Sequence, residues 1–444
     1  MSSQVSSDAR LVSNKDDLRR YILDGSKPIE KWVVGTEHEK FGWRLKDASP
    51  VDYFGQGGIS DVLHAFKAFG WTDQANDANL LALSRRGATI TLEPGGQLEL
   101  SGAPLRSLLD TERELREHVD ELAEISRTFG LAWSGLGLFP FGQPDDAPRM
   151  PKPRYDILEA RLRKAGQYGI HMMRQTATVQ ANLDFSDEDD AMRKWRAALM
   201  LQPIVVAMFA NSPIVDGHLT GECSFRARVW LDTDDARCRL PDHLLGSAPT
   251  LDGYIDWTLN VPMLFIHRDG HYLDCRGRTF REYMRDGFGE HRATVGDYAL
   301  HLSTLFPDVR LKQFLEVRAA DMGSLDSVTA LSAFHTGLLY DERGLEQTLE
   351  IFKDVTPPMW RRMREQVCRD GMDATVLGSD FGDLAQTLVG LAQDGLSRWQ
   401  PEAAHLLDGL SKRTAQRMTP ADALVAHYRK NTSQRELLEL SRII

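Results

Sequence analysis

Residues 88–102 read ATITLEPGGQLELSG, two runs of alternating residues joined by Pro94, Gly95 and Gly96. A Pro-Gly-Gly break between two alternating runs predicts a β-hairpin. Because neighbouring side chains of a strand point to opposite faces, the apolar residues of both runs share one face. The other face then carries only polar side chains, namely Thr89, Thr91, Glu93, Gln97 and Glu99. The hairpin therefore predicts an antiparallel sheet whose polar face holds two glutamates close together.

Four other segments show the same alternation and are expected to be strands of this sheet. In residues 32–39, Glu37 and Glu39 share a face and lie about 7 Å apart along the strand. The other three segments are residues 174–184, 225–233 and 310–318. Their polar faces carry Gln180 and Asn182 in the first, Arg226, Arg228, Trp230 and Asp232 in the second, and Lys312, Glu316 and Arg318 in the third.

Each strand alone has an ordinary explanation, a sheet that is packed on one face and wet on the other. Together they place five glutamates, several arginines and amides opposite an apolar face. If these polar faces line one concavity, the glutamates repel each other unless divalent cations occupy the space. Magnesium takes carboxylate and water oxygens beside substrate phosphates, and arginine binds carboxylate or phosphate oxygens with two N–H groups. The joint pattern favours metal-assisted phosphoryl transfer.

The rest of the chain favours a polar lead-in at residues 1–31 and a single catalytic domain at residues 32–444. Apolar periodicity predicts long helices over 104–129 and 190–209, and shorter ones over 327–339, 345–352, 358–368, 384–395 and 420–428. The chain is therefore expected to be mainly helical from about residue 321. Strands lie before and between helices at irregular spacing, which favours an α+β fold with an antiparallel sheet. No Rossmann or P-loop motif is present.

Charge, cysteine spacing and hydropathy exclude several classes of protein and of partner. A net charge of −11 argues against a dedicated nucleic-acid partner. Four widely spaced cysteines exclude a zinc ribbon and a dense disulfide framework. The sequence has no apolar run long enough for a membrane span and no signal-peptide core at its start. We therefore expect no membrane partner and a cytoplasmic location.

The chain resembles the glutamate–cysteine ligase family of the plant and proteobacterial type, whose members catalyse the first step of glutathione synthesis. The resemblance covers about residues 30–430. Its segments are GTEHEKFGW (35–43), LEPGGQLELSGAP (92–104), MPKPRYDIL (150–158), MMRQTATVQANLDFS (172–186), LQPIVVAMFANSP (201–213), SFRARVWLDTD (224–234) and LEVRAAD (315–321). It implies a fold like that of glutamine synthetase and the guanido kinases, a curved antiparallel sheet forming a funnel wrapped by helices.

The resemblance also implies a two-step reaction. ATP, the co-substrate, phosphorylates the γ-carboxylate of glutamate with Mg²⁺ as cofactor, and the amine of cysteine then displaces phosphate. The expected partners are thus glutamate, cysteine and ATP, on a monomer or a homodimer.

Site roles follow from the same resemblance. The implied metal ligands are Glu37, Glu39, Glu93, Glu99 and Glu316, with Gln180 or Asn182 completing a coordination shell. Arg318 would contact the transferred phosphoryl group and Arg226 a substrate carboxylate. The further substrate contacts expected are Arg174, Arg154, Tyr155 and Asn182, and Trp230 would form a wall of the cysteine pocket.

Two features depart from the family pattern. The stretch after the last strand is usually glycine-rich with a tryptophan, whereas residues 319–324 read AADMGS. Plant members carry a plastid extension and regulatory disulfides. We expect neither here, because the sequence shows no such extension and its four cysteines give no clear pair, so it favours a bacterial cytosolic enzyme. A ligase that joins glutamate to a different amine is the main alternative. A glycoside hydrolase would need two carboxylates and not five, and a non-catalytic cation-binding protein would release no phosphate from ATP.

Overall fold

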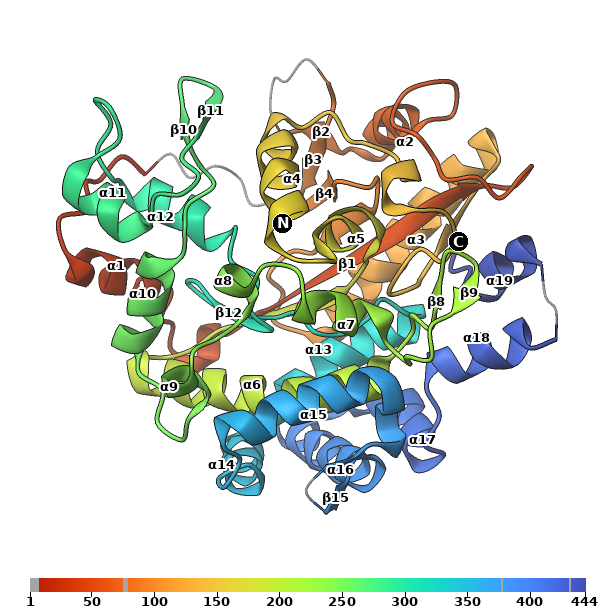
Figure 1. Cartoon of the computed structure of the whole chain (residues 1–444). Helices are drawn as coiled ribbons and strands as arrows, with labels where there is room; N and C mark the ends of the chain where they lie inside the picture. Colours follow the sequence, from red (N-terminus) through yellow and green to blue (C-terminus); the bar gives the residue numbers. More distant parts are fainter. Residues whose placement is uncertain (1–7, 75–78, 377, 431–432) are drawn as a thin grey trace.

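The computed structural model describes residues 8–74, 79–376, 378–430 and 433–444, so residues 1–7 of the expected lead-in lie outside it. In this described part, nine strands form one antiparallel sheet (Figure 1). Eight follow the order β12 (Val309–Leu311), β13 (Leu315–Val317), β7 (Val179–Leu183), β1 (Val34–Arg44), β5 (Leu98–Ser101), β4 (Ala88–Leu92), β3 (Ala82–Arg85) and β2 (Thr72–Asp73), while β6 (Leu131–Ser134) pairs with β1. The expected α+β fold with an antiparallel sheet is confirmed.

The hairpin predicted over residues 88–102 is formed by β4 and β5. Ile90 is opposed by Leu100, and Thr91 by Glu99. At the turn, Gly96 has a φ of 85°, a conformation that glycine adopts without a steric penalty. Its N–H donates to the Glu93 carbonyl at 3.0 Å. The hairpin predicted from the sequence is therefore present, with both strands and the turn at the expected residues.

Residues 225–233 were predicted to be a strand, and this prediction is wrong. Residues 225–231 form the helix α7 (Phe225–Leu231), and the Ser224 hydroxyl accepts the N–H of Ala227 at its start. Alternation in a short segment is a weaker determinant of local structure than such a cap, because the cap satisfies an otherwise unpaired N–H. Arg226 and Trp230 still share a face, because residues four apart are neighbours on a helix.

Two other predicted strands are shorter than expected. Residues 310–318 form a hairpin of β12 and β13, in which the N–H of Lys312 donates to the Phe314 carbonyl at 2.9 Å. Of residues 174–184, only β7 is a strand, and Arg174 belongs to the preceding helix α5 (Gly169–Gln175). Arg174 therefore does not share a strand face with Gln180.

Helices cover the sheet and form the C-terminal part, as predicted (Figure 1). The two long ones are α3 (Leu108–Phe129) and α6 (Glu188–Phe209). The N-terminal and central ones are α1 (Lys15–Leu23), α2 (Ile59–Phe66), α4 (Pro153–Ala165), α8 (Asp235–Cys238), α9 (Asp242–Leu245), α10 (Leu251–Asn260), α11 (Phe280–Asp286) and α12 (Val295–Leu302). The C-terminal ones are α13 (Leu325–Leu339), α14 (Glu342–Ile351), α15 (Pro357–Asp370), α16 (Phe381–Trp399), α17 (Asp408–Ala415), α18 (Pro420–Tyr428) and α19 (Gln434–Leu440).

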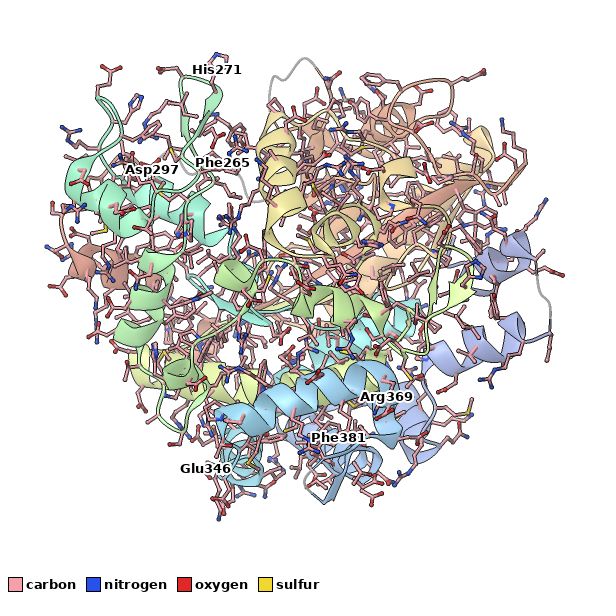
Figure 2. The ribbon with its side chains drawn as sticks, viewed as in Figure 1. Phe265, His271, Asp297, Glu346, Arg369 and Phe381 are labelled. Atoms are coloured by element: carbon pink, nitrogen blue, oxygen red, sulfur yellow. The ribbon has the colours of Figure 1, made fainter. Side chains whose placement is uncertain are left out.

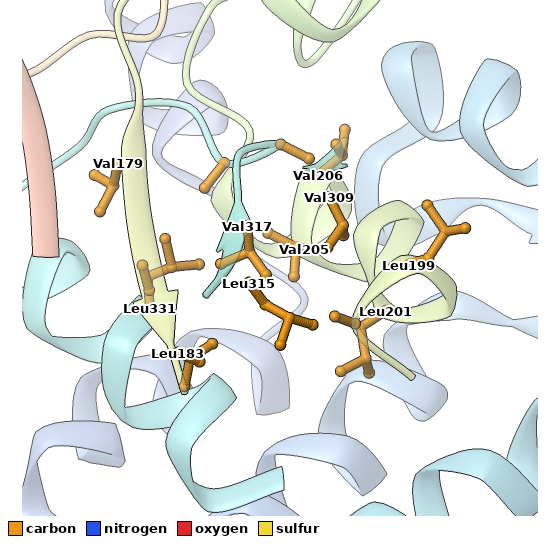
Figure 3. Packing of buried hydrophobic residues seen from close by; sticks show 14 of the residues in the cluster. Val179, Leu183, Leu199, Leu201, Val205, Val206, Val309, Leu315, Val317 and Leu331 are labelled. Carbon is orange, nitrogen blue, oxygen red and sulfur yellow. The ribbon is translucent and has the colours of Figure 1, made fainter. Parts of the chain in front are cut away.

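The apolar face of the sheet forms the main core. Figure 3 shows Val179 and Leu183 of β7 and Leu315 and Val317 of β13 packed near side chains of α6 and α13. These residues are almost completely buried. Burial of one face on helices leaves the opposite, polar face of the same strands to build a site.

A second hairpin lies apart from this sheet. Strands β10 (Phe265–Arg268) and β11 (His271–Asp274) project beside α12, with His271 near the tip (Figure 2). Arg268 donates to both carboxylate oxygens of Asp297 on α12 at 2.7 and 2.6 Å, which ties the hairpin to the helix.

Candidate functional site

One face of the sheet gathers most of the acidic side chains that the sequence predicts there. Directly opposed residues of antiparallel strands point to the same face. The opposed pairs are Glu39 with Glu99, Glu37 with Gln180, and Glu316 with Asn182. The predicted shared face is therefore present, and it extends over β5, β1, β7 and β13.

Burial and like-charge repulsion act together on the two glutamates of β1. Burial, followed by the charges of Glu316 and Glu99, raises the pKa of Glu37 to about 7. Burial, followed by the charges of Glu93 and Glu99, raises the pKa of Glu39 well above its usual value. The influence on Glu39 places the Glu93 carboxylate close to this pair. These carboxylates ionise readily only if a cation joins them.

Glu316 has the opposite environment. Burial would raise its pKa, but the charges of Arg310, Lys312 and Arg318 overcome burial and hold this pKa well below its usual value. Arg310 donates to both carboxylate oxygens, at 2.5 and 2.9 Å, and both side chains are 2% exposed. The site thus has a repulsive centre on β1 and a neutralised glutamate on β13.

Arg318, the predicted phosphoryl contact, lies on the same face. Its Nη1 donates to Gln180 Oε1 at 2.6 Å and lies 3.3 Å from Glu316 Oε2. The Gln180 oxygen that was predicted to bind metal therefore accepts a hydrogen bond from Arg318 here. The other end of this amide, Nε2, is buried and has no acceptor among the described residues.

Arg226 reaches the site from α7 and not from a strand. Its two terminal nitrogens donate to the carbonyls of Ala319 and Arg318, each at 3.0 Å. Its Nη1 also lies 3.7 Å from Asp321. The guanidinium carbon is 6.0 Å from the centre of the Trp230 ring. Arg226 therefore holds the segment at which the sequence departs from the family pattern.

The three remaining predicted contacts divide into two groups. Tyr155 donates its hydroxyl to the Leu92 carbonyl at 2.7 Å, beside Glu93, and Arg154 lies 5.5 Å from its ring. Arg174 lies at the hairpin turn, where it lines a cavity with Gly95 and Gly96, and it is already paired, because it donates to Glu159 at 2.6 Å and to Asp145 at 3.0 Å. Because its guanidinium is paired with two carboxylates, Arg174 supports the fold around the hairpin turn and its charge is already neutralised.

The glutamates of the face fit magnesium by their chemistry, and each also has a protein partner. Glu37 accepts from the Asn182 amide at 2.8 Å, Glu39 from the Thr178 N–H at 3.0 Å, and Glu99 from the Thr91 hydroxyl at 2.8 Å. As the side chains stand, no three acidic, histidine or cysteine residues of the described ranges form a ready metal cluster. Carboxylate oxygens on one face with raised pKa values are nevertheless a donor set that a hard cation would stabilise.

Two residues that support the candidate site were not among those predicted from the sequence. Arg310 neutralises Glu316 only because β12 and β13 form a hairpin that places the two residues opposite each other. Asp321 accepts from the Asn211 N–H and from the hydroxyls of Ser212 and Ser224, at 2.7 to 2.9 Å. It therefore anchors α7, and no pattern in the sequence indicates that role.

Comparisons with known proteins agree with this architecture. A family model described as glutamate-cysteine ligase family 2 matches residues 33–441. The chloroplastic glutamate–cysteine ligase of Brassica juncea is 38% identical over 93% of this chain and 81% of its own. Glutamate–cysteine ligase B of Oryza sativa subsp. japonica, also chloroplastic, is 37% identical over 93% and 84%. The expected enzyme class is confirmed.

Solved structures support the fold alone, since their sequence identities are low. A glutamate–cysteine ligase of Francisella tularensis in complex with AMP superposes with a TM-score of 0.59 at 14% identity, over 92% of this chain and 87% of its own. A bifunctional glutathione synthetase of Pasteurella multocida gives 0.51 at 13% identity, over 97% and 53%.

The relatives also correct one prediction. The cytoplasmic location is contradicted, because these relatives are described as chloroplastic. That prediction rested on the lack of an apolar leader, which identifies secretory signals but not the amphipathic, serine- and arginine-rich transit peptides. Within the described ranges, no helix has the length and apolar character needed to cross a membrane. The chain belongs to glutamate-cysteine ligase family 2.

Proposed function

We propose that this protein joins the γ-carboxylate of glutamate to the amine of cysteine, with ATP cleaved to ADP and phosphate, as the first step of glutathione synthesis. The observation that carries the proposal is the strand register, which sets Glu37, Glu39, Glu99 and Glu316 on one face beside Arg318. Acidic residues that repel each other are suited to hold Mg²⁺ and its nucleotide phosphates. The family supports the same activity.

In this proposal the glutamates of the face, with Glu93, bind the metal. Bound Mg²⁺ would neutralise the phosphates of ATP and the charge that develops on the transferred group. Arg318, whose guanidinium already lies among the polar side chains, is placed to bind the phosphoryl oxygens. Glu316 orients Arg318 from 3.3 Å, and Arg310 keeps Glu316 ionised.

Arg226 is placed to bind a substrate carboxylate. It is fully buried, it lies 3.7 Å from the Asp321 carboxylate, and its hydrogen bonds go to neutral carbonyls. Burial lowers its pKa, so binding a carboxylate would stabilise the guanidinium. The Trp230 ring beside it would give the amino-acid side an apolar wall.

We infer that the nucleotide base enters a cavity of about 340 Å³ at the hairpin turn. Gly95 and Gly96, which follow Glu93, line this cavity together with Phe41 and Phe139. The two rings are 5.5 Å apart. Phe41 continues the face of Glu37 and Glu39 along β1. If the base stacked there, the phosphates of the nucleotide would point toward the glutamates. This site uses neither a P-loop nor a Rossmann fold.

Phosphate release from ATP tests the proposal. With Mg²⁺ and glutamate, release should become rapid only when cysteine is added, and chelation of Mg²⁺ should abolish it. Replacing cysteine with other amines distinguishes the proposed enzyme from a ligase of another specificity. Release that needs no cysteine, or that prefers another amine, would refute the proposed substrate pair. Sedimentation of the active protein then decides between the monomer and the homodimer.

A further inference from the structure

A cavity of about 570 Å³ lies outside the acidic face, between α7, α15 and the segment that leads into β12. Aromatic side chains supply much of its wall, namely Tyr168, Trp230, Phe306 and Trp360. The rings of Trp230 and Phe306 are 5.8 Å apart. Cavities of this size with aromatic walls and a few polar groups are typical of small-molecule sites.

Three N–H donors in residues that line this cavity have no acceptor among the described residues. They are Arg364 Nη1, Arg361 Nε and the indole Nε1 of Trp230. Arg364 is the strongest case, because its side chain is 2% exposed and its other nitrogens donate to Asp308 at 2.7 and 2.9 Å. Buried donors without an acceptor are costly and uncommon in native proteins. An acceptor supplied from the cavity would remove this cost.

The charges around the cavity indicate which kind of acceptor fits. Four carboxylates line it, but Asp308 is held by Arg364, and Asp232, Asp235 and Glu365 are exposed at its rim. The donors without acceptors belong to two guanidinium groups and an indole. An anionic oxygen forms the strongest hydrogen bonds with such donors, and the aromatic walls would cover an apolar body.

We propose that this cavity is a second ligand site, which binds a small organic anion with an aromatic body. The site adjoins the catalytic one without sharing its acidic face. The Asp308 carbonyl accepts the backbone N–H of Arg318 at 3.0 Å, and Trp230 contacts Arg226. An occupant would therefore touch residues that are next to both predicted catalytic arginines.

Binding of 8-anilinonaphthalene-1-sulfonate to the purified full-length chain tests this proposal, because the dye is an aromatic anion whose fluorescence rises on burial. We expect one saturable site. Its affinity should fall about tenfold in Arg361→Met, the loss expected for one charged hydrogen bond. N-phenyl-1-naphthylamine, which lacks the sulfonate, should bind the parent protein no more tightly than the dye binds Arg361→Met. Saturating MgATP and glutamate should not displace the dye.

Arg362→Met is the matched control, because Arg362 is the next residue of α15, is exposed and does not line the cavity. It should bind the dye like the parent protein. The proposal would be overturned if folded Arg361→Met bound the dye as tightly as the parent protein does, or if the uncharged amine bound the parent as tightly as the dye. Displacement of the dye by MgATP would overturn it too. If Arg361→Met does not fold, Trp230→Phe provides the second measurement, since it removes only the indole N–H and keeps an aromatic ring; unchanged dye affinity there would overturn it too.

Discussion

At the scale of single residues, the glutamates of the polar face differ in what surrounds them. Glu39 is buried beside Glu93 and Glu99, so its charge is disfavoured until a cation arrives. Glu316 is buried among Arg310, Lys312 and Arg318, so its charge is required. Two residues expected to serve one reaction therefore have opposite effects on the stability of the metal-free protein.

The first prediction follows from this contrast. Without metal at neutral pH, Glu39→Gln should raise the free energy of unfolding by about 1 kcal/mol, because it removes a carboxyl whose charge is disfavoured by burial and by like-charge repulsion. Glu316→Gln should lower it by about 3–5 kcal/mol, because it leaves Arg310 buried without its ion pair. Both should abolish Mg²⁺-dependent turnover. Urea denaturation and phosphate release measure the two effects.

Glu346→Gln is the control for both variants, since Glu346 is exposed on α14, far from the sheet's polar face (Figure 2). It should leave stability and turnover unchanged. Mg²⁺ should raise the melting temperature of the parent protein but not that of Glu39→Gln. A destabilised Glu39→Gln, or one that still responds to Mg²⁺, would contradict the assigned environment.

Alternation in the sequence predicts which residues share a face, but not what neutralises them. It identified Glu37, Glu39, Glu99 and Glu316 on one face correctly. It missed Arg310, because that ion pair depends on an unpredicted turn at residues 312–314. Roles assigned by resemblance alone, such as the substrate contact expected of Arg174, depend on tertiary partners that no local pattern reveals.

At the scale of elements, α7 shows how a cap and a distant anchor override a short alternating pattern. Residues 225–231 alternate like a strand, yet Ser224 caps a helix and is itself held by Asp321, 97 residues later in the chain. Such long-range hydrogen bonds are invisible in the local sequence. The long helices and the 88–102 hairpin were predictable because their periodicity extends over many residues and is bounded by turn or cap signals.

Close packing of α13 on α16 gives the second prediction. A Cβ at Gly395 would overlap the Gly337 carbonyl, whereas a Cβ at Gly390, on the same helix, has no neighbour within 4 Å. Gly395→Ala should therefore destabilise the protein by about 1–3 kcal/mol through overpacking. Gly390→Ala should stabilise it by about 0.5–1 kcal/mol, because alanine favours the helix.

Thermal melting of both variants checks this prediction under identical conditions, and each serves as the other's control. The two substitutions are chemically identical and five residues apart. If Gly395→Ala were as stable as Gly390→Ala, the close helix approach would not exist.

At the scale of the whole molecule, buried neutral histidines make stability depend on pH. Burial, only partly offset by a hydrogen bond to the Leu331 carbonyl, lowers the pKa of His335 to about 4. Burial likewise lowers the pKa of His301 to about 3. In the unfolded chain these imidazoles bind protons below about pH 6.5, so the unfolded state gains protons first as the pH falls. Stability should therefore decrease from about pH 6.5 toward pH 4.

His335→Leu tests this third prediction. Between pH 7 and pH 5, the parent protein should lose about 2 kcal/mol of stability to His335 alone, and the variant should lose that much less. Urea denaturation at the two pH values measures the difference. His271→Leu, at an exposed position of the β10–β11 hairpin (Figure 2), should keep the parent's pH dependence. Identical pH dependence in parent and His335→Leu would show that this histidine is not buried in its neutral form.

The overall architecture was the most predictable level, because an antiparallel sheet with one polar face follows from alternation in several strands at once. The helical C-terminal part was equally clear from its periodicity. The strand order was not predictable, since β13 and β7 meet across more than 130 residues of chain.

The central claim is that the acidic face supports transfer of phosphate to the γ-carboxylate of glutamate. Glutamate labelled with ¹⁸O in its γ-carboxylate tests this most directly in a complete reaction with MgATP and cysteine. If a γ-glutamyl phosphate forms, one labelled oxygen per turnover must appear in the released phosphate, because the acyl carbon–oxygen bond breaks when the amine attacks. Released phosphate without ¹⁸O would contradict the account, because ATP would then be cleaved without activating glutamate.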